Sequence, residues 1–227
     1  MKTEIILALD VDNFAKARNL INRLYPIIRI FKVGSQLFTA CGPKIIEFIN
    51  KKGGEVFLDL KFFDIPNTVS RSVRMALRHK VKMLTLHIAG GEDMMKAAIS
   101  AAKDEKAKKG AKKILLVGVT VLTSKKTQPS KVIALARMGV KCGLDGVVCS
   151  VREARMLRKS IARRFIIVTP GIRPQASLKD DQRRTATVSE AVLAGSDYLV
   201  IGRPILEADD PKAAAKSILG EIYARRD

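Results

Sequence analysis

Short apolar runs recur along the chain, and each is followed by a stretch with helical periodicity. The runs are rich in Val, Ile and Leu, as is typical of strands that are buried on both faces. They occupy residues 5–10, 28–33, 56–61, 83–87, 114–120, 146–150, 165–171 and 198–203. This pattern predicts eight strands of a parallel sheet.

Amphipathic stretches fill the intervals between these runs. The first begins at an Asx residue that can cap a helix, Asp12 or Asn13, and the second ends at the helix-terminating pair Gly53 and Gly54. We expect helices within residues 12–26, 35–54, 67–80, 91–110, 131–143, 151–161, 187–196 and 210–226.

Eight strand–helix units in 227 residues predict an α/β fold, a (β/α)8 TIM barrel. We expect one catalytic domain over residues 1–227, because no linker or low-complexity segment divides the chain. The alternative architecture is an open, doubly wound sheet. Its dinucleotide-binding form is disfavoured, since no G-x-G-x-x-G sequence follows the first predicted strand.

Polar residues end most of the predicted strands. Asp10 ends the first strand, Lys32 lies near the end of the second, and His87 ends the fourth. Active sites of such barrels lie at the C-terminal ends of the strands. A lone His87 fits a site residue and a satisfied core residue equally well, whereas charges at barrel-lining positions are costly unless they are paired.

The third predicted strand, "VFLDLK", carries two of these charges. Side chains alternate along a strand, so Asp59 and Lys61 share one face. If that face points inward, they meet Asp10 and Lys32 at the barrel mouth, with Asp64 just beyond. Carboxylates beside each ammonium favour its charged form, which suits proton donation better than Schiff-base chemistry.

A second group of polar residues follows the seventh and eighth strands. Residues 169–188 are the longest irregular stretch and contain Arg173 and Gln182, while Gly202 and Arg203 follow the eighth strand. Loops at these two places form the phosphate site of many barrels. Arginine binds phosphate in a bidentate manner, glycine lets the backbone approach an anion, and Gln182 could close from the long loop as a lid.

Six segments, in order over nearly the whole chain, resemble the orotidine 5′-phosphate decarboxylase family. They are "LALDVDN", "FKVGSQLFT", "DLKFFDIPNT", "VTVLTS", "VTPGIRP…DQRR" and "YLVIGRPI". The D-x-K-x-x-D element is shared with sister phosphate-binding barrels, but the combination is specific. The resemblance implies decarboxylation of orotidine 5′-monophosphate to uridine 5′-monophosphate, the last step of de novo pyrimidine synthesis, without metal or cofactor.

The resemblance also implies roles for the charged residues. Lys61 resembles the general acid that protonates C6 of the pyrimidine, and Asp59 resembles the carboxylate set against the substrate's own carboxylate. Lys32 and Asp10 resemble the residues that order this array and bind the ribose.

Other positions correspond to contacts with the partner subunit, the pyrimidine and the phosphate. Asp64, with Thr68 beside it, resembles a residue that reaches the partner's site, which implies a homodimer with shared active sites. Thr123 resembles the contact to the pyrimidine ring. The phosphate grip corresponds to Arg173, Gln182, Gly202 and Arg203.

The net charge of +20 is the one unusual bulk property. It raises the alternative of a nucleic-acid-binding protein, but few aromatic residues interleave with the basic ones, as a stacking platform requires. Solvated helix faces such as residues 103–113 and 151–164 account for much of the charge. We therefore expect neither nucleic acid nor a membrane as partner.

Two further observations bear on the compartment and on a metal. Three scattered cysteines lack metal-ligand spacing, and no apolar run is long enough to cross a bilayer, so we expect a cytoplasmic enzyme with reduced thiols. The sister metal-dependent decarboxylases and aldolases carry a metal-binding acid where Lys32 stands. A cation at that position disfavours a divalent metal.

Overall fold

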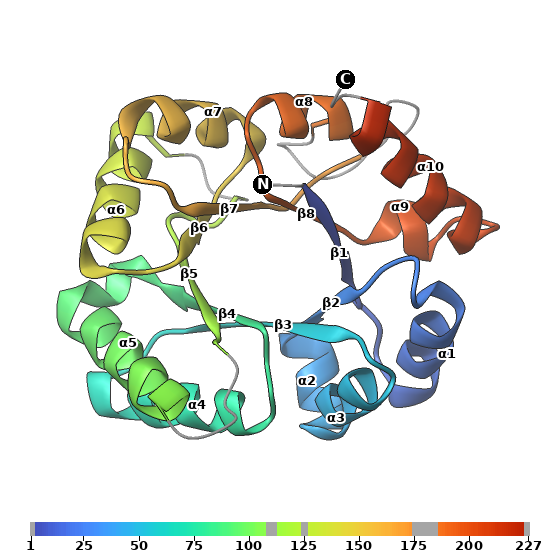
Figure 1. Ribbon diagram of the computed structural model, residues 1–227, viewed down its shortest axis with the longest axis horizontal. Helices are drawn as coiled ribbons and strands as arrows, with labels where there is room; N and C mark the ends of the chain where they lie inside the picture. Colours follow the sequence, from blue (N-terminus) through green and yellow to red (C-terminus); the bar gives the residue numbers. More distant parts are fainter. Residues whose placement is uncertain (1–2, 108–112, 124–126, 174–185, 225–227) are drawn as a thin grey trace.

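In the computed structural model, which describes residues 3–107, 113–123, 127–173 and 186–224, eight parallel strands close into a barrel (Figure 1). Each strand pairs with its neighbours in chain order, and the first pairs with the last. The predicted (β/α)8 fold is thus confirmed. The strands are β1 (Glu4–Ala8), β2 (Ile30–Gly34), β3 (Glu55–Phe62), β4 (Met83–His87), β5 (Leu115–Val119), β6 (Gly146–Val148), β7 (Ile166–Thr169) and β8 (Tyr198–Ile201).

Helices surround the barrel on its outside (Figure 1). Those that match the predicted stretches are α1 (Phe14–Leu24), α4 (Pro66–Arg78), α5 (Gly91–Ala107), α6 (Pro129–Cys142), α7 (Val151–Ser160), α8 (Val188–Leu193) and α10 (Pro211–Ala224). Two short elements were not predicted, the 3-10 helix η1 (Ile88–Gly90) and α9 (Arg203–Leu206). None of the helices in the described part of the chain is long and apolar enough to cross a membrane.

The stretch 35–54 is not one helix. It divides into α2 (Ser35–Cys41) and α3 (Lys44–Lys51). Gly42 between them has a φ of 57°, which glycine adopts readily, and Pro43 lacks the N–H that a continuing helix needs. The expected single helix was therefore wrong at this Gly-Pro pair.

Two hydrophobic layers follow from the alternation along the strands. The outer layer packs the sheet against the helices and includes Leu7, Phe31 and Leu84. The inner layer fills the barrel with Ile6, Ile30, Phe57, Met83, Val117, Val168, Tyr198 and Val200. Because the interior is filled, polar residues that continue the inward-facing rows toward the C-terminal ends stand on an apolar floor.

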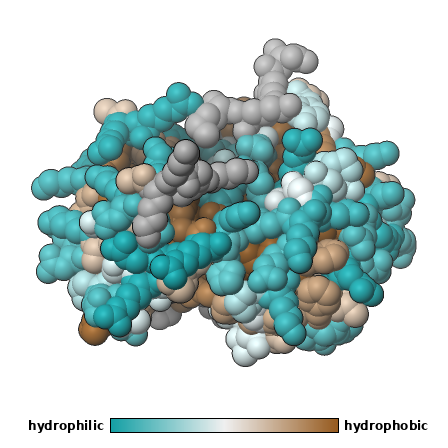
Figure 2. All heavy atoms as spheres, turned by 60° about the horizontal axis from the view of Figure 1, so that its bottom comes forward, coloured by the Kyte–Doolittle hydropathy of each residue, from teal (hydrophilic) through white to brown (hydrophobic). Residues whose placement is uncertain are grey.

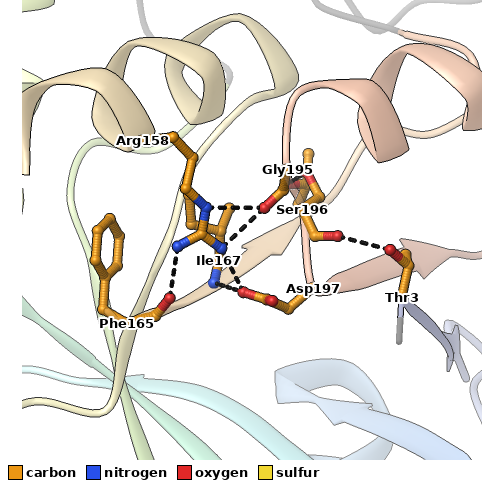
Figure 3. A network of polar contacts seen from close by, with 8 residues as sticks. Thr3, Arg158, Phe165, Ile167, Gly195, Ser196 and Asp197 are labelled. Atoms are coloured by element: carbon orange, nitrogen blue, oxygen red, sulfur yellow. Dashed lines mark hydrogen bonds and ion pairs between the residues drawn. The ribbon is translucent and has the colours of Figure 1, made fainter. Parts of the chain in front are cut away.

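At the opposite end of the barrel, Arg158 of α7 holds the starts of β7 and β8 together (Figure 3). Its guanidinium donates to Phe165 O (2.7 Å) and, through Nε and Nη2, to Gly195 O (3.0 and 2.8 Å). It also pairs with Asp197 at 2.5 Å, and that carboxylate accepts the Ile167 N–H at 2.7 Å. We refer to these five residues as the Arg158 network.

Candidate active site

Four residues of alternating charge meet at the C-terminal ends of β1, β2 and β3. Lys32 Nζ lies 2.8 Å from Asp10 Oδ1 and 4.0 Å from Asp59 Oδ2. Lys61 Nζ donates to the same Asp59 oxygen at 2.9 Å. We call Asp10, Lys32, Asp59 and Lys61 the charged array.

Burial differs along the charged array. The two middle side chains, Lys32 and Asp59, are 13% and 14% exposed, whereas Lys61 is 36% and Asp10 56% exposed. Charges interact more strongly where the surroundings exclude water. The middle of the array is thus fixed, and its ends are open to a ligand.

Thr85 of β4 supports the array from below and was missed in the sequence. Its buried hydroxyl donates to Asp59 Oδ1 and accepts the backbone N–H of Lys61, both at 2.9 Å. A signal existed: in "MLTLH" Thr85 alternates with Met83, so it shares the face that fills the barrel. A hydroxyl on that face requires partners, and the array supplies them.

The backbone of β3 is irregular at Lys61. The pairing with β4 shifts register between Leu58 and Phe62, and Lys61 has a φ of 51°. A left-handed conformation costs a residue with a side chain about 1–2 kcal/mol. Simple alternation predicted that Asp59 and Lys61 share a face. They do meet, but the bulge, which directs the Lys61 N–H to Thr85, contributes to that geometry.

Gly34, two residues after Lys32, leaves room for the Lys32 ammonium. A Cβ atom on Gly34 would lie 3.2 Å from Lys32 Nζ and 3.9 Å from Asp10 Oδ1. A larger residue would therefore displace the first ion pair of the array.

His87 stands beside the array at the end of β4. Its ring lies 5.5 Å from that of Phe63, centroid to centroid. Burial, followed by the Lys61 ammonium, lowers the pKa of His87, while Asp59 acts in the opposite direction. A neutral imidazole is therefore favoured, and His87 is not among the residues that line the cavity described next.

A cavity of about 230 Å³ lies over the array. Its walls include apolar residues of β5, β6, β7 and β8, namely Val119, Val148, Val168 and Val200. Eight residues predicted from the sequence line this one space: Asp10, Lys32, Asp59, Lys61, Thr123, Arg173, Gly202 and Arg203. Gln182, the predicted lid residue, lies outside the described residues.

Gly202, which follows β8, lies close to Ala8 and Asp10 at the end of β1. A Cβ atom on Gly202 would lie 3.4 Å from Ala8 Cβ and 3.5 Å from Asp10 Oδ2. Arg173 is 4% exposed, and its Nη1 donates to Ile172 O at 3.0 Å. Guanidinium groups and a glycine backbone on one side thus face the charged array on the other, as a ligand with a remote anionic group requires.

Asp64 and Thr68 do not line this cavity. Both are exposed at the start of α4, and Asp64 Oδ1 accepts the N–H of Ile65 at 2.6 Å. The apolar side chains on either side of Asp64 are exposed as well, Phe63 at 63% and Ile65 at 65%. Within one chain, therefore, the last carboxylate of the D-x-K-x-x-D element is exposed and lies outside the lining of the array's cavity.

Over most of the face in view, the surface is hydrophilic (Figure 2).

No group of three or more His, Cys, Asp or Glu side chains that could hold a metal ion occurs among residues 3–107, 113–123, 127–173 and 186–224.

The chain is similar in sequence and in fold to known proteins. The model of the "Orotidine 5'-phosphate decarboxylase / HUMPS family" matches residues 3–218. An orotidine 5'-phosphate decarboxylase of Geobacter metallireducens is 46% identical over 98% of this chain and 97% of its own length. That of Moorella thermoacetica is 44% identical over 97% of this chain and 92% of its own.

A solved structure gives the same result. The crystal structure of orotidine 5'-phosphate decarboxylase from Lactobacillus acidophilus superposes with a TM-score of 0.85 and 34% sequence identity. The match covers 97% of this chain and 99% of that one.

Proposed function

This chain belongs to the orotidine 5′-phosphate decarboxylase / HUMPS family, and from that premise we propose how it acts. It is a decarboxylase that converts orotidine 5′-monophosphate to uridine 5′-monophosphate and carbon dioxide, the last step of de novo pyrimidine synthesis. The cytoplasm is its compartment, and it requires neither nucleic acid nor a membrane.

The substrate spans the cavity from the guanidinium groups to the charged array. Its phosphate is held by Arg173, Arg203 and the backbone of Gly202, with Gln182 closing from the long loop. Thr123 contacts the pyrimidine. The ribose lies between the phosphate and the pyrimidine, against Asp10 and Lys32. The closeness of Gly202 to Asp10 fits this arrangement, because the ribose directly follows the phosphate in the substrate.

The reaction breaks the bond between C6 and the carboxylate carbon. The electron pair of that bond stays on C6, carbon dioxide leaves, and the Lys61 ammonium transfers a proton to C6. Asp59 lies against the substrate's carboxylate, where repulsion between two anions favours the loss of one of them. The amine of Lys61 then regains its proton from solvent.

The barrier of this reaction is high because the ring barely delocalises the charge left on C6. Such reactions require a reduction in activation free energy on the order of 20 kcal/mol. Fixed positive charge at the developing carbanion is the largest available contribution, since it needs no reorganisation at the moment of reaction. Binding of the distant phosphate contributes by organising the site before the reaction.

One observation carries the choice of proton donor. Among the described residues, Lys61 Nζ has one ion pair, to Asp59 at 2.9 Å, and its side chain is 36% exposed and lines the cavity. Lys32 lies between two carboxylates and is only 13% exposed. Lys32 thus supports Asp59, and Lys61 is free to meet C6.

A metal-dependent reaction on a sugar phosphate is the alternative within the same family. Lys32 argues against it, because its ammonium occupies the space between Asp10 and Asp59 that a divalent cation would need. The absorbance change of orotidine 5′-monophosphate, measured with and without chelator, separates the two. We expect turnover that chelator leaves unchanged; loss of turnover with chelator, or none with this substrate, contradicts the assignment.

A homodimer with shared sites completes the proposal. Asp64 and Thr68 do not line the cavity of their own chain, and the exposed Phe63 and Ile65 near Asp64 supply apolar surface for a partner copy. Asp64 would then reach the array of the partner subunit.

Hybrid dimers test this shared site. When Asp64→Ala chains are mixed with Lys61→Ala chains under conditions of subunit exchange, each hybrid contains one intact site, so activity should return. A tagged pair that exchanges subunits yet stays inactive would refute sharing.

A further inference from the structure

A second, larger cavity lies at the end of the barrel opposite the charged array. Its volume is about 1050 Å³. Arg29 and Lys82 directly precede β2 and β4, and Glu55 begins β3, so the cavity opens at the N-terminal ends of the strands. We call it the basal cavity. It shares no lining residue with the cavity over the array.

The basal cavity concentrates positive charge. Its charged lining residues are six cations and one carboxylate, whereas the whole chain has 42 basic and 22 acidic residues. The cations are Arg29, Lys51, Arg78, Lys80, Lys82 and Lys113, and the carboxylate is Glu55. The catalytic proposal uses none of them.

Two of these cations are paired with acidic residues of the described ranges. Lys82 pairs with Glu55, and Lys113 lies 2.6 Å from Asp145. The other four, Arg29, Lys51, Arg78 and Lys80, have no ion pair or side-chain hydrogen bond within the described part of the chain. Four unpaired cations around one concave space produce a strongly positive potential there.

Helix ends explain part of this charge. Lys51 and Arg78 lie in the last turns of α3 and α4, where a cation interacts favourably with the helix dipole. Arg29 precedes a strand, so the same explanation does not apply to it.

Lys80 is harder to explain by folding alone. It follows the C-cap of α4 with a φ of 57°, and the matching position after α3 is Gly53 with a φ of 90°. Both N–H groups close the same kind of turn, to Leu77 O and Asn50 O. Glycine adopts this conformation at lower cost, so a lysine at this position carries backbone strain that a glycine would avoid.

The two helix ends that carry these cations are tied together. Asn50 Nδ2, in the last turn of α3, donates to His79 O at the end of α4 at 2.8 Å. The link fixes the distance between the cations of α3 and those of α4. A binding site arranged in this way before the ligand arrives loses less entropy on binding.

From this geometry we propose that the basal cavity binds a small polyanion with two or more linked phosphate groups. A chain of linked phosphate groups is longer and more highly charged than a single phosphate, so it can contact more of the unpaired cations that line the cavity. Apolar residues at the inner wall, Leu77, Val81 and Leu115, can take up the organic part of a nucleoside triphosphate. Inorganic triphosphate and a nucleotide share the recognised chemistry.

Calorimetric titration with inorganic triphosphate, and separately with ATP, tests the proposal. The triple variant Lys51→Gln/Arg78→Gln/Lys80→Gly removes three cations, and glycine suits the left-handed position. We expect at least a tenfold weaker affinity for triphosphate. The matched variant Lys44→Gln/Lys131→Gln/Lys216→Gln loses the same charge at exposed positions elsewhere and should stay within about twofold of the wild type. Tighter binding of ATP than of triphosphate identifies a nucleotide as the ligand; equal binding identifies the phosphate chain.

Several outcomes would overturn the proposal. Undetectable triphosphate binding by the wild-type chain would refute the site. An equal loss of affinity in both triple variants would mean that binding depends on net charge and not on this cavity. Loss of triphosphate binding in Arg203→Ala would place the probe in the catalytic cavity instead. Preferential binding of RNA, weakened by the basal triple variant, would assign the surface to nucleic acid.

Discussion

The charged array and the Arg158 network are similarly buried ion pairs at opposite ends of one barrel, but they differ in how their hydrogen-bonding groups are used. Asp59 and Asp197 are each 14% exposed, and their partners Lys61 and Arg158 are 36% and 29% exposed. The Arg158 guanidinium donates to two carbonyl oxygens and a carboxylate. Lys61 Nζ makes one hydrogen bond within the described part of the chain.

We interpret this difference as that between a structural ion pair and the reactive ion pair proposed above. Taking two charges out of water costs several kcal/mol per ion, which only good geometry and further hydrogen bonds offset. In the Arg158 network the protein itself provides those bonds. In the array, Lys61 lines the cavity and its ammonium has further donors, so we propose that a bound ligand supplies part of the offset.

Replacing the reactive cation should give the largest effect. Lys61→Ala removes the proposed proton donor and the positive charge at C6, so kcat/KM for orotidine 5′-monophosphate should fall at least about 1000-fold. The free energy of unfolding should change by less than about 1 kcal/mol, since Asp59 keeps Lys32 and Thr85. Lys16→Ala, which breaks an exposed pair with Asp12, is the control. Near-normal turnover in Lys61→Ala would refute its role.

Replacing the structural cation should do the reverse. Arg158→Ala removes the cation that pairs with Asp197, which keeps only the Ile167 N–H among the described residues, and the side-chain donor to two carbonyl groups. The free energy of unfolding should therefore fall by about 3 kcal/mol in urea titration. Turnover by the folded fraction should be unchanged. Arg137→Ala removes one exposed bond, to Ser160 O at 3.1 Å, and should cost less than about 0.5 kcal/mol. Equal losses in the two variants would mean that the network adds no stability.

Thr85 lies between these extremes, because it supports the array structurally. Thr85→Val keeps the shape but leaves Asp59 Oδ1 and the Lys61 N–H without their partner. We expect roughly a tenfold lower kcat with a stability loss of about 1 kcal/mol. Thr85→Ser should restore kcat. Thr169→Val, at an equally buried hydroxyl that bonds Ser196, should lower stability and leave kcat unchanged.

His87 should give the smallest effect. Its pKa is lowered in the folded state, so the unfolded chain binds more protons and stability rises with pH. The contribution is present above the unfolded pKa of about 6.5 and is lost as pH falls through the folded pKa. Between about pH 5 and 8, we expect His87 to change the free energy of unfolding by less than about 1 kcal/mol. The variant His87→Asn should lack this change when its unfolding is measured over the same pH range. A wild-type slope of opposite sign would contradict the direction.

The sequence predicted the barrel and most of its lining because both follow from local alternation and from strand ends. It did not predict the Thr85 bonds or the bulge at Lys61, since both depend on the register between β3 and β4. The break at Gly42 and Pro43 was visible in the sequence and was outweighed by the hydrophobic pattern on either side. Alternation along β3 does not indicate that Asp64 lies outside the array's cavity, because Asp64 follows the end of that strand.

Because the backbone at Lys61 is left-handed, selection for stable folding and selection for activity should favour different residues at this position. Glycine and asparagine suit that conformation best, yet neither carries an ammonium. A library randomised at this codon and sorted for folding should therefore enrich residues that abolish turnover, while sorting for growth without pyrimidine should return lysine alone. That outcome would show that the proposed chemistry, and not folding, requires a lysine at this position.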